Sequence, residues 1–385
     1  MPMPTDRRLG TRVACALLLL GFVVAGCGNV SPTPGPSTSQ ATLATATASP
    51  VVSPDVSQSP SPTPTPLPTP TPLPTGTVPG IDGTLADAAL SFRTPLAVMI
   101  DDNVVARPQA GFNAAALVYQ APADGGETRY MMVFQATDAK TVGPVRSGRP
   151  FLVRWAAEYR AGLAHYGGDY MTLGQTIPQL RGTLIFDLDA LSGSGAAFHR
   201  VRSRAAPHNA YTGTAELRRV LLAHGGPALQ APGFDVRAYV DDAPLAARPT
   251  ASTISVPYPR GSADYLYDRS RDLYLRSVAG RAQVDAGDGQ RVTARNVIVL
   301  FMRKSIDPNS ERGHARIVLD EIGSGDALVF REGRFWKATW RKPSIAAMTR
   351  VFDASGAEIA LVRGRTFIQV VPLGTRITYR AAAGS

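Results

Sequence analysis

Leu96-Ala-Val-Met-Ile100, with Asp101-Asp-Asn103 directly after it, gives the clearest indication of the fold in this chain. A continuous apolar run of this length that ends in polar turn residues is typical of a buried strand. Residues 117–121 and 129–136 predict two more strands, and Asp124-Gly-Gly126 supplies the turn between them. We therefore expect the folded region to begin with three strands, the first of them buried.

Segments with helical spacing are interleaved with these strands. Phe151, Trp155 and Tyr159 recur on one face and predict a helix over 147–160. A short strand, a weakly helical segment and a clear helix are then expected at residues 163–166, 170–180 and 212–224. Thr212 or Thr214 would be the N-cap of the last helix, and Gly225-Gly226 would stop it.

From about residue 250 the pattern changes to short strands separated by turns. Strand composition occurs at 253–256, 265–268, 273–278, 296–302, 315–321, 327–331, 335–340, 358–362 and 367–371. Such a series is typical of antiparallel sheets and needs no helix. We therefore predict an α+β protein, with an N-terminal α/β domain that has a mixed sheet over 81–245 and a mostly antiparallel, β-rich C-terminal domain over 246–385.

The first 26 residues have the pattern of a lipoprotein signal peptide. Its basic residues are Arg7, Arg8 and Arg12, and the apolar run over 13–25 is too short to span a membrane. The run ends in Val24-Ala-Gly-Cys27, which matches a lipobox. We expect Cys27 to be lipidated, which would anchor the protein at the outer face of the cytoplasmic membrane. The alternative is an ordinary signal peptide with a chance cysteine.

Residues 27–80 are predicted to form a tether. Pro occupies every second position from Pro60 to Pro74, alternating with Ser, Thr and Leu. This composition favours extended polyproline II and cannot bury a core. At about 3.1 Å per residue, such a segment reaches at most roughly 160 Å. The globular region could therefore lie well out in the cell wall.

The bulk composition narrows the classes of partner. The chain has 40 Lys and Arg against 30 Asp and Glu, a formal net charge of +10. Only four of the basic residues are Lys and the rest are Arg. Either a GC-rich genome, which favours Arg codons, or an anionic partner explains this preference. Export argues against nucleic acid and leaves wall polymers, lipid headgroups or a peptide carboxylate. Cys15 would leave with the signal and Cys27 would be acylated, so no thiol remains for a disulfide, a zinc site or a nucleophile.

A series of short motifs runs through the folded region in a fixed order. They include Ala97-Val-Met-Ile-Asp-Asp-Asn103, Ala106-Arg-Pro-Gln-Ala-Gly111, Val118-Tyr-Gln-Ala-Pro122, Val142-Gly-Pro-Val-Arg-Ser-Gly-Arg-Pro150, Pro207-His-Asn-Ala-Tyr211 and Gly364-Arg-Thr-Phe-Ile368. Together they resemble the YerB-like lipoproteins, a family with a paired N- and C-terminal domain of unknown function. The resemblance covers about residues 90–380 and implies a cell-envelope lipoprotein without an established reaction. Gln120 and Asp124 stand where glutamate is expected, and Phe367 where tryptophan is usual. If an acid at position 120 were catalytic, this chain would be impaired.

Basic residues around the predicted helix at 147–160 suggest an anion site. Arg146-Ser-Gly-Arg149 opens this helix, and a helix N-terminus suits an anion. Arg129 begins the preceding strand, and consecutive elements are usually neighbours. We therefore expect Arg129, Arg146 and Arg149 to face one cavity, with Arg204 and His208 at its rim. In the alternative interpretation these arginines pair inside the fold with acids, namely Asp101, Asp102 and Asp187.

Two further pairs carry weaker hypotheses. His165 and Asp169 could act as acid and base, or His165 could be a hydrogen-bonded structural residue. Asp101 and Asp102 could bind a divalent cation, or they could simply form a turn. No other cofactor is expected.

No catalytic motif of the kinds HExxH, GxSxG, GxGxxG or P-loop occurs in the chain. We expect a non-enzymatic module that binds an anionic wall polymer or a wall-synthesis or wall-hydrolase partner. The alternative is an enzyme acting on an anionic envelope substrate. The order strand, turn, strand, Val145-Arg146, helix resembles the LytR–CpsA–Psr phosphotransferases, which hold a lipid pyrophosphate with arginines. An open pocket with an acid and a metal site would favour the enzyme, and arginines buried in ion pairs would favour the binding module.

Overall fold

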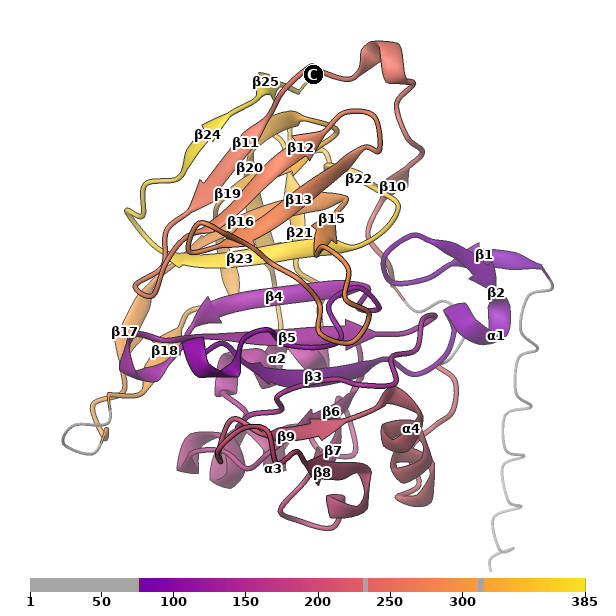
Figure 1. The fold of residues 1–385 in the computed structure, drawn as a ribbon, viewed down its shortest axis with the longest axis vertical. Helices are drawn as coiled ribbons and strands as arrows, with labels where there is room; N and C mark the ends of the chain where they lie inside the picture. The colour runs from indigo at the N-terminus through magenta and orange to yellow at the C-terminus, as the bar shows by residue number, and fades with distance from the viewer. Residues whose placement is uncertain (1–75, 231–234, 311–314, 385) are drawn as a thin grey trace, which may run out of the picture. The chain divides into compact units, whose positions relative to one another are not determined.

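A mixed sheet of eleven strands runs through both halves of the folded region (Figure 1). The structure is a computed structural model that describes residues 76–230, 235–310 and 315–384. The strand order is β21-β20-β19-β16-β23-β4-β5-β3-β6-β7, and β25 pairs with β20. The strands are β3 (Leu96–Asp101), β4 (Leu117–Pro122), β5 (Thr128–Phe134), β6 (Gly162–His165), β7 (Phe186–Asp189), β16 (Asn296–Met302), β19 (Gly323–Arg331), β20 (Arg334–Lys342), β21 (Arg350–Phe352), β23 (Thr366–Pro372) and β25 (Ala382–Ala383).

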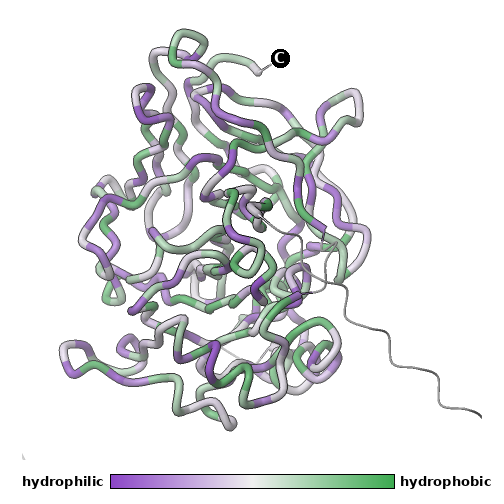
Figure 2. The backbone as a smooth tube through the Cα atoms, turned by 90° about the vertical axis from the view of Figure 1, so that its right-hand side faces the viewer, coloured by the Kyte–Doolittle hydropathy of each residue, from purple (hydrophilic) through white to green (hydrophobic). Residues whose placement is uncertain are grey.

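Both faces of the central strands of this sheet are buried, which explains the continuous apolar runs in β3, β4, β5, β16 and β23. Along β16, Val297 and Val299 belong to the core on one face, while Ile298 and Leu300 belong to the core on the other. Figure 2 shows hydrophobic stretches interleaved with hydrophilic ones along the chain. All six residues of β3 are buried, as the sequence predicted.

Helices cover the two faces of the N-terminal part of the sheet. Helix α2 (Pro150–Ala157) packs on one face, where Trp155 stacks on Tyr119 of β4 with ring centroids 5.3 Å apart. Helix α4 (Thr214–Ala223) contributes Leu217 and other apolar residues to the core on the opposite face. A short helix α1 (Ala88–Ser91) precedes β3, and a π-helical turn (Thr172–Thr176) leads into α3 (Ile177–Leu180).

The two longer helices differ in detail from the sequence prediction. Helix α2 starts later than residue 147, because Pro150 at its first position holds Arg149 in an extended conformation with φ −136° and ψ 143°. The N-cap of α4 is Gly213, so the prediction of Thr212 or Thr214 as N-cap is wrong. The hydroxyl of Thr214 instead donates to Oδ1 of Asp138, at 2.9 Å.

A second sheet has six strands, all paired antiparallel, and covers the C-terminal part of the first sheet (Figure 1). Its strands are β11 (Thr253–Val256), β12 (Ala263–Asp268), β13 (Leu273–Val278), β14 (Arg281–Ala282), β15 (Thr293–Ala294) and β24 (Thr378–Arg380). Ile254 and Tyr265 from this sheet share a core with Val297 and Phe367. The α+β fold, with a mixed N-terminal layer and a β-rich C-terminal part, is therefore confirmed.

Four small pairs of strands complete the fold. They are β1 (Thr77–Pro79) with β2 (Leu85–Asp87), β8 (Phe198–Arg200) with β9 (Ala210–Thr212), β10 (Tyr239–Val240) with β22 (Leu361–Val362), and β17 (Lys304–Ile306) with β18 (Ile317–Leu319). Strand β1 lies inside the segment predicted as tether, whereas Cys27 lies outside the described residues. In the described part of the chain, no helix has the length and apolarity needed to cross a membrane.

The two halves are joined within one sheet. Strand β4 pairs in parallel with β23, so that Leu117 lies opposite Thr366 (Figure 1). The division of the chain at residues 245 and 246 stays a prediction.

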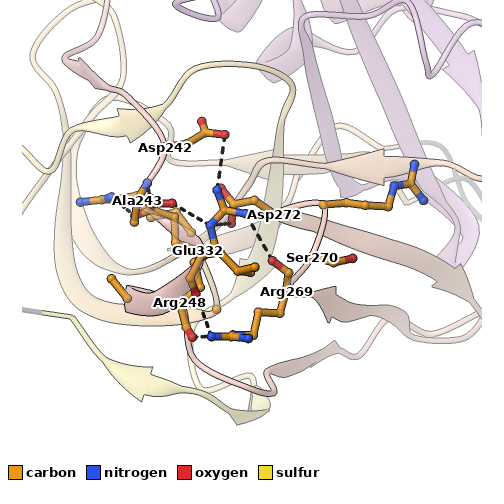
Figure 3. Close-up of polar contacts among 12 residues, drawn as sticks. Asp242, Ala243, Arg248, Arg269, Ser270, Asp272 and Glu332 are labelled. Atoms are coloured by element: carbon orange, nitrogen blue, oxygen red, sulfur yellow. Dashed lines mark hydrogen bonds and ion pairs between the residues drawn. The ribbon is translucent and has the colours of Figure 1, made fainter.

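The connection between the halves is held by a polar network (Figure 3). The backbone N–H of Ala243 donates to Oε1 of Glu332 at 2.6 Å, and Nε of Arg248 donates to the carbonyl of Ala243 at 2.8 Å. Nη2 of Arg295 lies 3.5 Å from Oδ2 of Asp272. Asp272 and Glu332 are both buried, and their charges are matched by these arginines and by Arg331. The network therefore fixes the connection.

Candidate functional site

A cavity of about 740 Å³ lies between the start of β5, the segment before α2 and the β17–β18 hairpin. Its charged lining residues are Asp124, Glu127, Arg129, Arg146, Arg149, Asp169 and Arg316. The cavity therefore brings together Arg129, Arg146 and Arg149, the three arginines that the sequence singled out for one site.

Local backbone structure explains how these arginines come together. Gly125 and Gly126, with φ of 70° and 74°, turn the chain sharply so that Arg129 is the second residue of β5 and lies opposite Asp101 of β3. The N–H of Arg146 donates to the carbonyl of Met99 at 2.8 Å, which places the extended segment before α2 beside the end of β3. Arg146 and Arg149 therefore reach the cavity from an extended segment and not, as predicted, from one face of a helix.

Arg129 is buried without a partner. Its side chain is 5% exposed, and it makes no hydrogen bond or ion pair with any residue in the described ranges. Burial first, and then the charges of Arg149 and Arg146, lower the pKa of Arg129 to about 9, although Asp101 and Asp124 act in the opposite direction. A buried charged group without a partner is rare in proteins and calls for an explanation, such as an unseen ion.

Arg149 and Arg146 have partial partners. Nη2 of Arg149 lies 2.8 Å from Oδ2 of Asp124, and its Nε lies 3.9 Å from Oδ2 of Asp169. Nε of Arg146 lies 3.3 Å from Oδ2 of Asp101. Neither Nε forms a hydrogen bond within the part of the chain that the structure describes. The internal pairing that the sequence left open therefore holds for Arg146 with Asp101. Several N–H donors of Arg129, Arg146 and Arg149 still have no acceptor among the described residues.

Arg204 and His208 do not line the cavity, so their predicted place at its rim does not hold. Nδ1 of His208 is 2.6 Å from Oδ2 of Asp101, the carboxylate oxygen that also faces Arg146. Arg204 donates to the carbonyl of Pro108 at 2.9 Å and to that of Ala106. Both residues thus support the walls behind the cavity.

His165 and Asp169 are not brought together. His165 is fully buried, and its ring nitrogens face the carbonyl of Gly167 and Oδ1 of Asp187, each at 2.8 Å. Burial lowers the pKa of His165, but these two acceptors and Asp189 outweigh it, so the pKa lies above its usual value. Asp169 lines the cavity separately. The pair therefore forms no acid–base dyad, and His165 has a structural environment.

Asp101 and Asp102 point into different networks. Asp102 accepts from Thr128 and from Nε2 of Gln120, the latter at 3.0 Å, and pairs with Arg107 at 2.9 Å. Across the described residues, no three His, Cys, Asp or Glu side chains gather in a way that could hold a metal ion. The hypothesis of a divalent cation at Asp101 and Asp102 therefore finds no support in the geometry.

Sequence reasoning did not place Asp124, Glu127 and the fourth arginine, Arg316, in the cavity. Asp124 was interpreted as a turn residue and as a departure from the family pattern, yet its Oδ1 also accepts from the N–H of Ile317, at 2.9 Å. Arg316 comes from the C-terminal half and lies over the ring of Tyr170, 4.5 Å from its centroid. Since these contacts join distant segments, local pattern gave no signal for them.

Comparisons with known proteins extend over most of the folded region. Residues 83–226 match the family described as "Protein of unknown function (DUF3048) N-terminal domain", and residues 254–368 match its C-terminal domain. The chain is 26% identical over 304 residues to "Putative lipoprotein YerB" of Bacillus subtilis (strain 168), which covers 76% of this chain and 85% of the relative. The crystal structure of YerB from Bacillus subtilis is similar with a TM-score of 0.68 at 24% identity, covering 79% of this chain and 99% of that one. The solved structure supports the fold, and the sequence matches confirm the family resemblance.

Proposed function

Because the chain belongs to the YerB-like family, in which the two DUF3048 domains are paired, we propose that it is a membrane-anchored envelope lipoprotein that binds an anionic wall polymer in the cavity at Arg129. The name of its Bacillus relative and the lipobox at Cys27 support the anchor and a position at the outer face of the cytoplasmic membrane. The anionic ligand rests on the chemistry of the cavity.

The single observation that carries the binding role is the unpartnered charge of Arg129. Its guanidinium lies among two further arginines, and like charges repel strongly where water is scarce. A phosphate or carboxylate would accept hydrogen bonds from the unpartnered Nε and Nη1 of Arg129 and would offset the repulsion. Nε of Arg146 and Nε of Arg149 provide two more donors at the same cavity.

Thermal unfolding in the presence of a simple anion tests the proposal. Inorganic phosphate should raise the melting temperature of the chain relative to chloride at equal ionic strength, because a ligand that binds only the folded state adds RT ln(1 + [L]/Kd) to its stability. Arg146→Ala should abolish this rise while the variant stays folded, since Asp101 keeps His208 as a partner. Arg271→Ala, at an exposed turn, is the matched control and should behave like the parent.

Two results would count against binding. If phosphate leaves the parent unchanged and Arg146→Ala unfolds the protein, the arginines are structural. If a wall enzyme is retained by the immobilised protein while wall polymer is not, the partner is a protein.

A second candidate function is catalysis on an anionic envelope substrate. The observation that favours it is that Asp124, Glu127 and Asp169 line the same cavity as the arginines. Asp169→Asn separates the two functions. An enzyme should release a product from isolated wall polymer, detectable by mass spectrometry, and lose this activity in the variant, whereas a binding module releases nothing and keeps or strengthens its affinity.

A further inference from the structure

A second cavity, of about 670 Å³, lies beside the first and has a different charge. Its charged lining residues are Arg107, Arg260 and Arg281, and no Asp or Glu is among the described residues that line it. Arg107 is held by Asp102 at 2.9 Å, whereas Arg281 is exposed and has no ion-pair partner in the described chain. The second cavity is therefore lined by positive side chains, of which Arg281 has no counter-charge among the described residues.

Only a thin wall separates the two cavities. Glu127 of the first cavity and Arg260 of the second form an ion pair across it, with Oε1 and Nε 3.4 Å apart. Asp101 also spans the wall, because its Oδ2 faces Arg146 on one side and its backbone carbonyl accepts from Nε2 of Gln109 on the other, at 2.9 Å. One ligand of modest length could therefore contact both cavities.

Gln109 supplies an unpartnered acceptor in the second cavity. The residue is fully buried, and its Nε2 donates to the carbonyl of Asp101 and to Oδ1 of Asp102, at 2.9 and 3.2 Å. These two bonds fix the orientation of the amide, and its Oε1 has no hydrogen-bond partner in the described structure. An acceptor in this position can receive a hydrogen bond from a ligand, and a hydroxyl group is the simplest neutral donor.

We propose that the two cavities form one binding surface for a linear polymer in which phosphodiester groups alternate with hydroxylated units. This inference rests on the anion-binding role of the first cavity. One phosphodiester would lie against Arg129 and its neighbours, a second would lie near Arg260 and Arg281, and a hydroxyl between them would donate to Oε1 of Gln109. A single anion in the first cavity would leave the charge of Arg281 in the second cavity without a counter-charge.

Chain length should therefore decide the affinity. Once one unit of a polymer is bound, the next unit is present at a high effective concentration, and the combined affinity exceeds that of a single unit. Isothermal titration of the full chain carrying Cys27→Ser with poly(glycerol phosphate) of about ten units should give a Kd at least about tenfold lower than with glycerol 3-phosphate. Inorganic polyphosphate of the same length, which lacks hydroxyls, should bind more weakly than poly(glycerol phosphate).

Variants of the second cavity give the sharper test. Arg281→Ala should remove most of the gain from chain length and leave the Kd for glycerol 3-phosphate unchanged, because Arg281 has no ion-pair partner in the described chain. Arg260 is left in place, since its loss would free the charge of Glu127 in the first cavity. Arg271→Ala removes an equally exposed charge from the opposite end of β13, about 20 Å away at 3.3 Å per residue, and should change neither value.

Each contrary result has a distinct meaning. If glycerol 3-phosphate binds and Arg146→Ala abolishes this binding, but the polymer gains nothing over the single unit, the second cavity is not part of the site and only this inference fails. If polyphosphate binds as tightly as poly(glycerol phosphate), the role given to Gln109 is wrong. If no phosphate compound binds, the anion-binding function fails with it.

Discussion

Replacing Arg129 with methionine should make the free protein more stable. Methionine keeps most of the apolar stem of the arginine and removes its charge. Most buried arginines are paired, and truncating one costs several kcal/mol because its partner is left behind. Arg129 has no hydrogen-bond or ion-pair partner among the described residues, so nothing is left unpaired by the change. The expected sign is therefore opposite to that of an ordinary buried arginine.

The pKa of Arg129 gives the magnitude. Burial and the neighbouring arginines lower it to about 9. At 1.36 kcal/mol per pKa unit, the fall from the ordinary arginine value corresponds to a cost on the order of 5 kcal/mol. Relaxation and bound ions reduce this cost, and replacing buried charges by apolar residues typically stabilises by about 1 to 4 kcal/mol. We expect Arg129→Met to raise the free energy of unfolding within this range.

The pH dependence follows from the same pKa. Because the folded state loses the proton of Arg129 at lower pH than the unfolded state does, the cost is fully present below about pH 9 and decreases as the pH rises above it. The advantage of Arg129→Met over the parent should therefore shrink between pH 7 and pH 10.

The appropriate assay is urea unfolding monitored by tryptophan fluorescence. The buffer should contain no phosphate, sulfate or carboxylate, because these anions could fill the cavity. Urea is preferable to guanidinium chloride because it adds no ions. The same variant should lose the stabilisation by phosphate. If Arg129→Met instead lowers the free energy of unfolding by about 3 kcal/mol or more, Arg129 is paired in solution and the argument for an anion site collapses.

Further predictions concern the anchor, the tether and two buried groups. Cys27→Ser should release the protein from the membrane fraction, and persistence in membranes after a carbonate wash would refute lipidation. Deleting residues 31–75 should change the melting temperature of the globular part by less than about 1 °C, because their composition cannot bury a core; a large drop would show that they pack on it. His165→Gln should cost more stability at pH 5 than at pH 8 in urea titrations, because a raised histidine pKa stabilises the fold at low pH and this contribution is lost as the pH rises through it; equal costs at both values would contradict a protonated His165. Glu158→Gln should cost about 3 to 5 kcal/mol, because it leaves the fully buried ammonium of Lys342, 2.9 Å away, without its counter-charge; a loss under about 1 kcal/mol would mean that water reaches the pair.

The strands could be predicted from sequence wherever burial is two-sided. The apolar runs of β3, β4 and β16 are long enough to identify each strand alone. Strand β7 was missed, because Phe186-Asp-Leu-Asp189 has only four residues and two of them are acidic. The pairing of β4 with β23 was also out of reach, since nothing within either strand specifies a partner about 250 residues away. The hydrophobic pattern of the sequence thus predicts the strands, whereas tertiary packing determines which strands become neighbours.

The candidate site was predicted in part, and partly for a wrong reason. The three arginines line one cavity, but an extended segment places two of them there and the expected helix starts only at Pro150. Arg204 and His208 were grouped with these arginines because they are basic. The sequence does not show, however, that His208 contacts Asp101 from outside the cavity or that Arg204 binds the carbonyl of Pro108. The anion-binding role itself stays a prediction.

Gln120 shows why a departure from the family pattern need not affect the site. Its side chain is buried away from both cavities, with Nε2 donating to Oδ2 of Asp102 at 3.0 Å and Oε1 accepting from Nη2 of Arg276 at 2.6 Å. A carboxylate at this position could accept from Arg276 but could not donate to Asp102, and two like charges would meet without water. The amide is the group that matches both neighbours at once. The glutamine thus satisfies an internal network between the halves of the chain, and its presence says nothing against the function of the arginines that line the cavity.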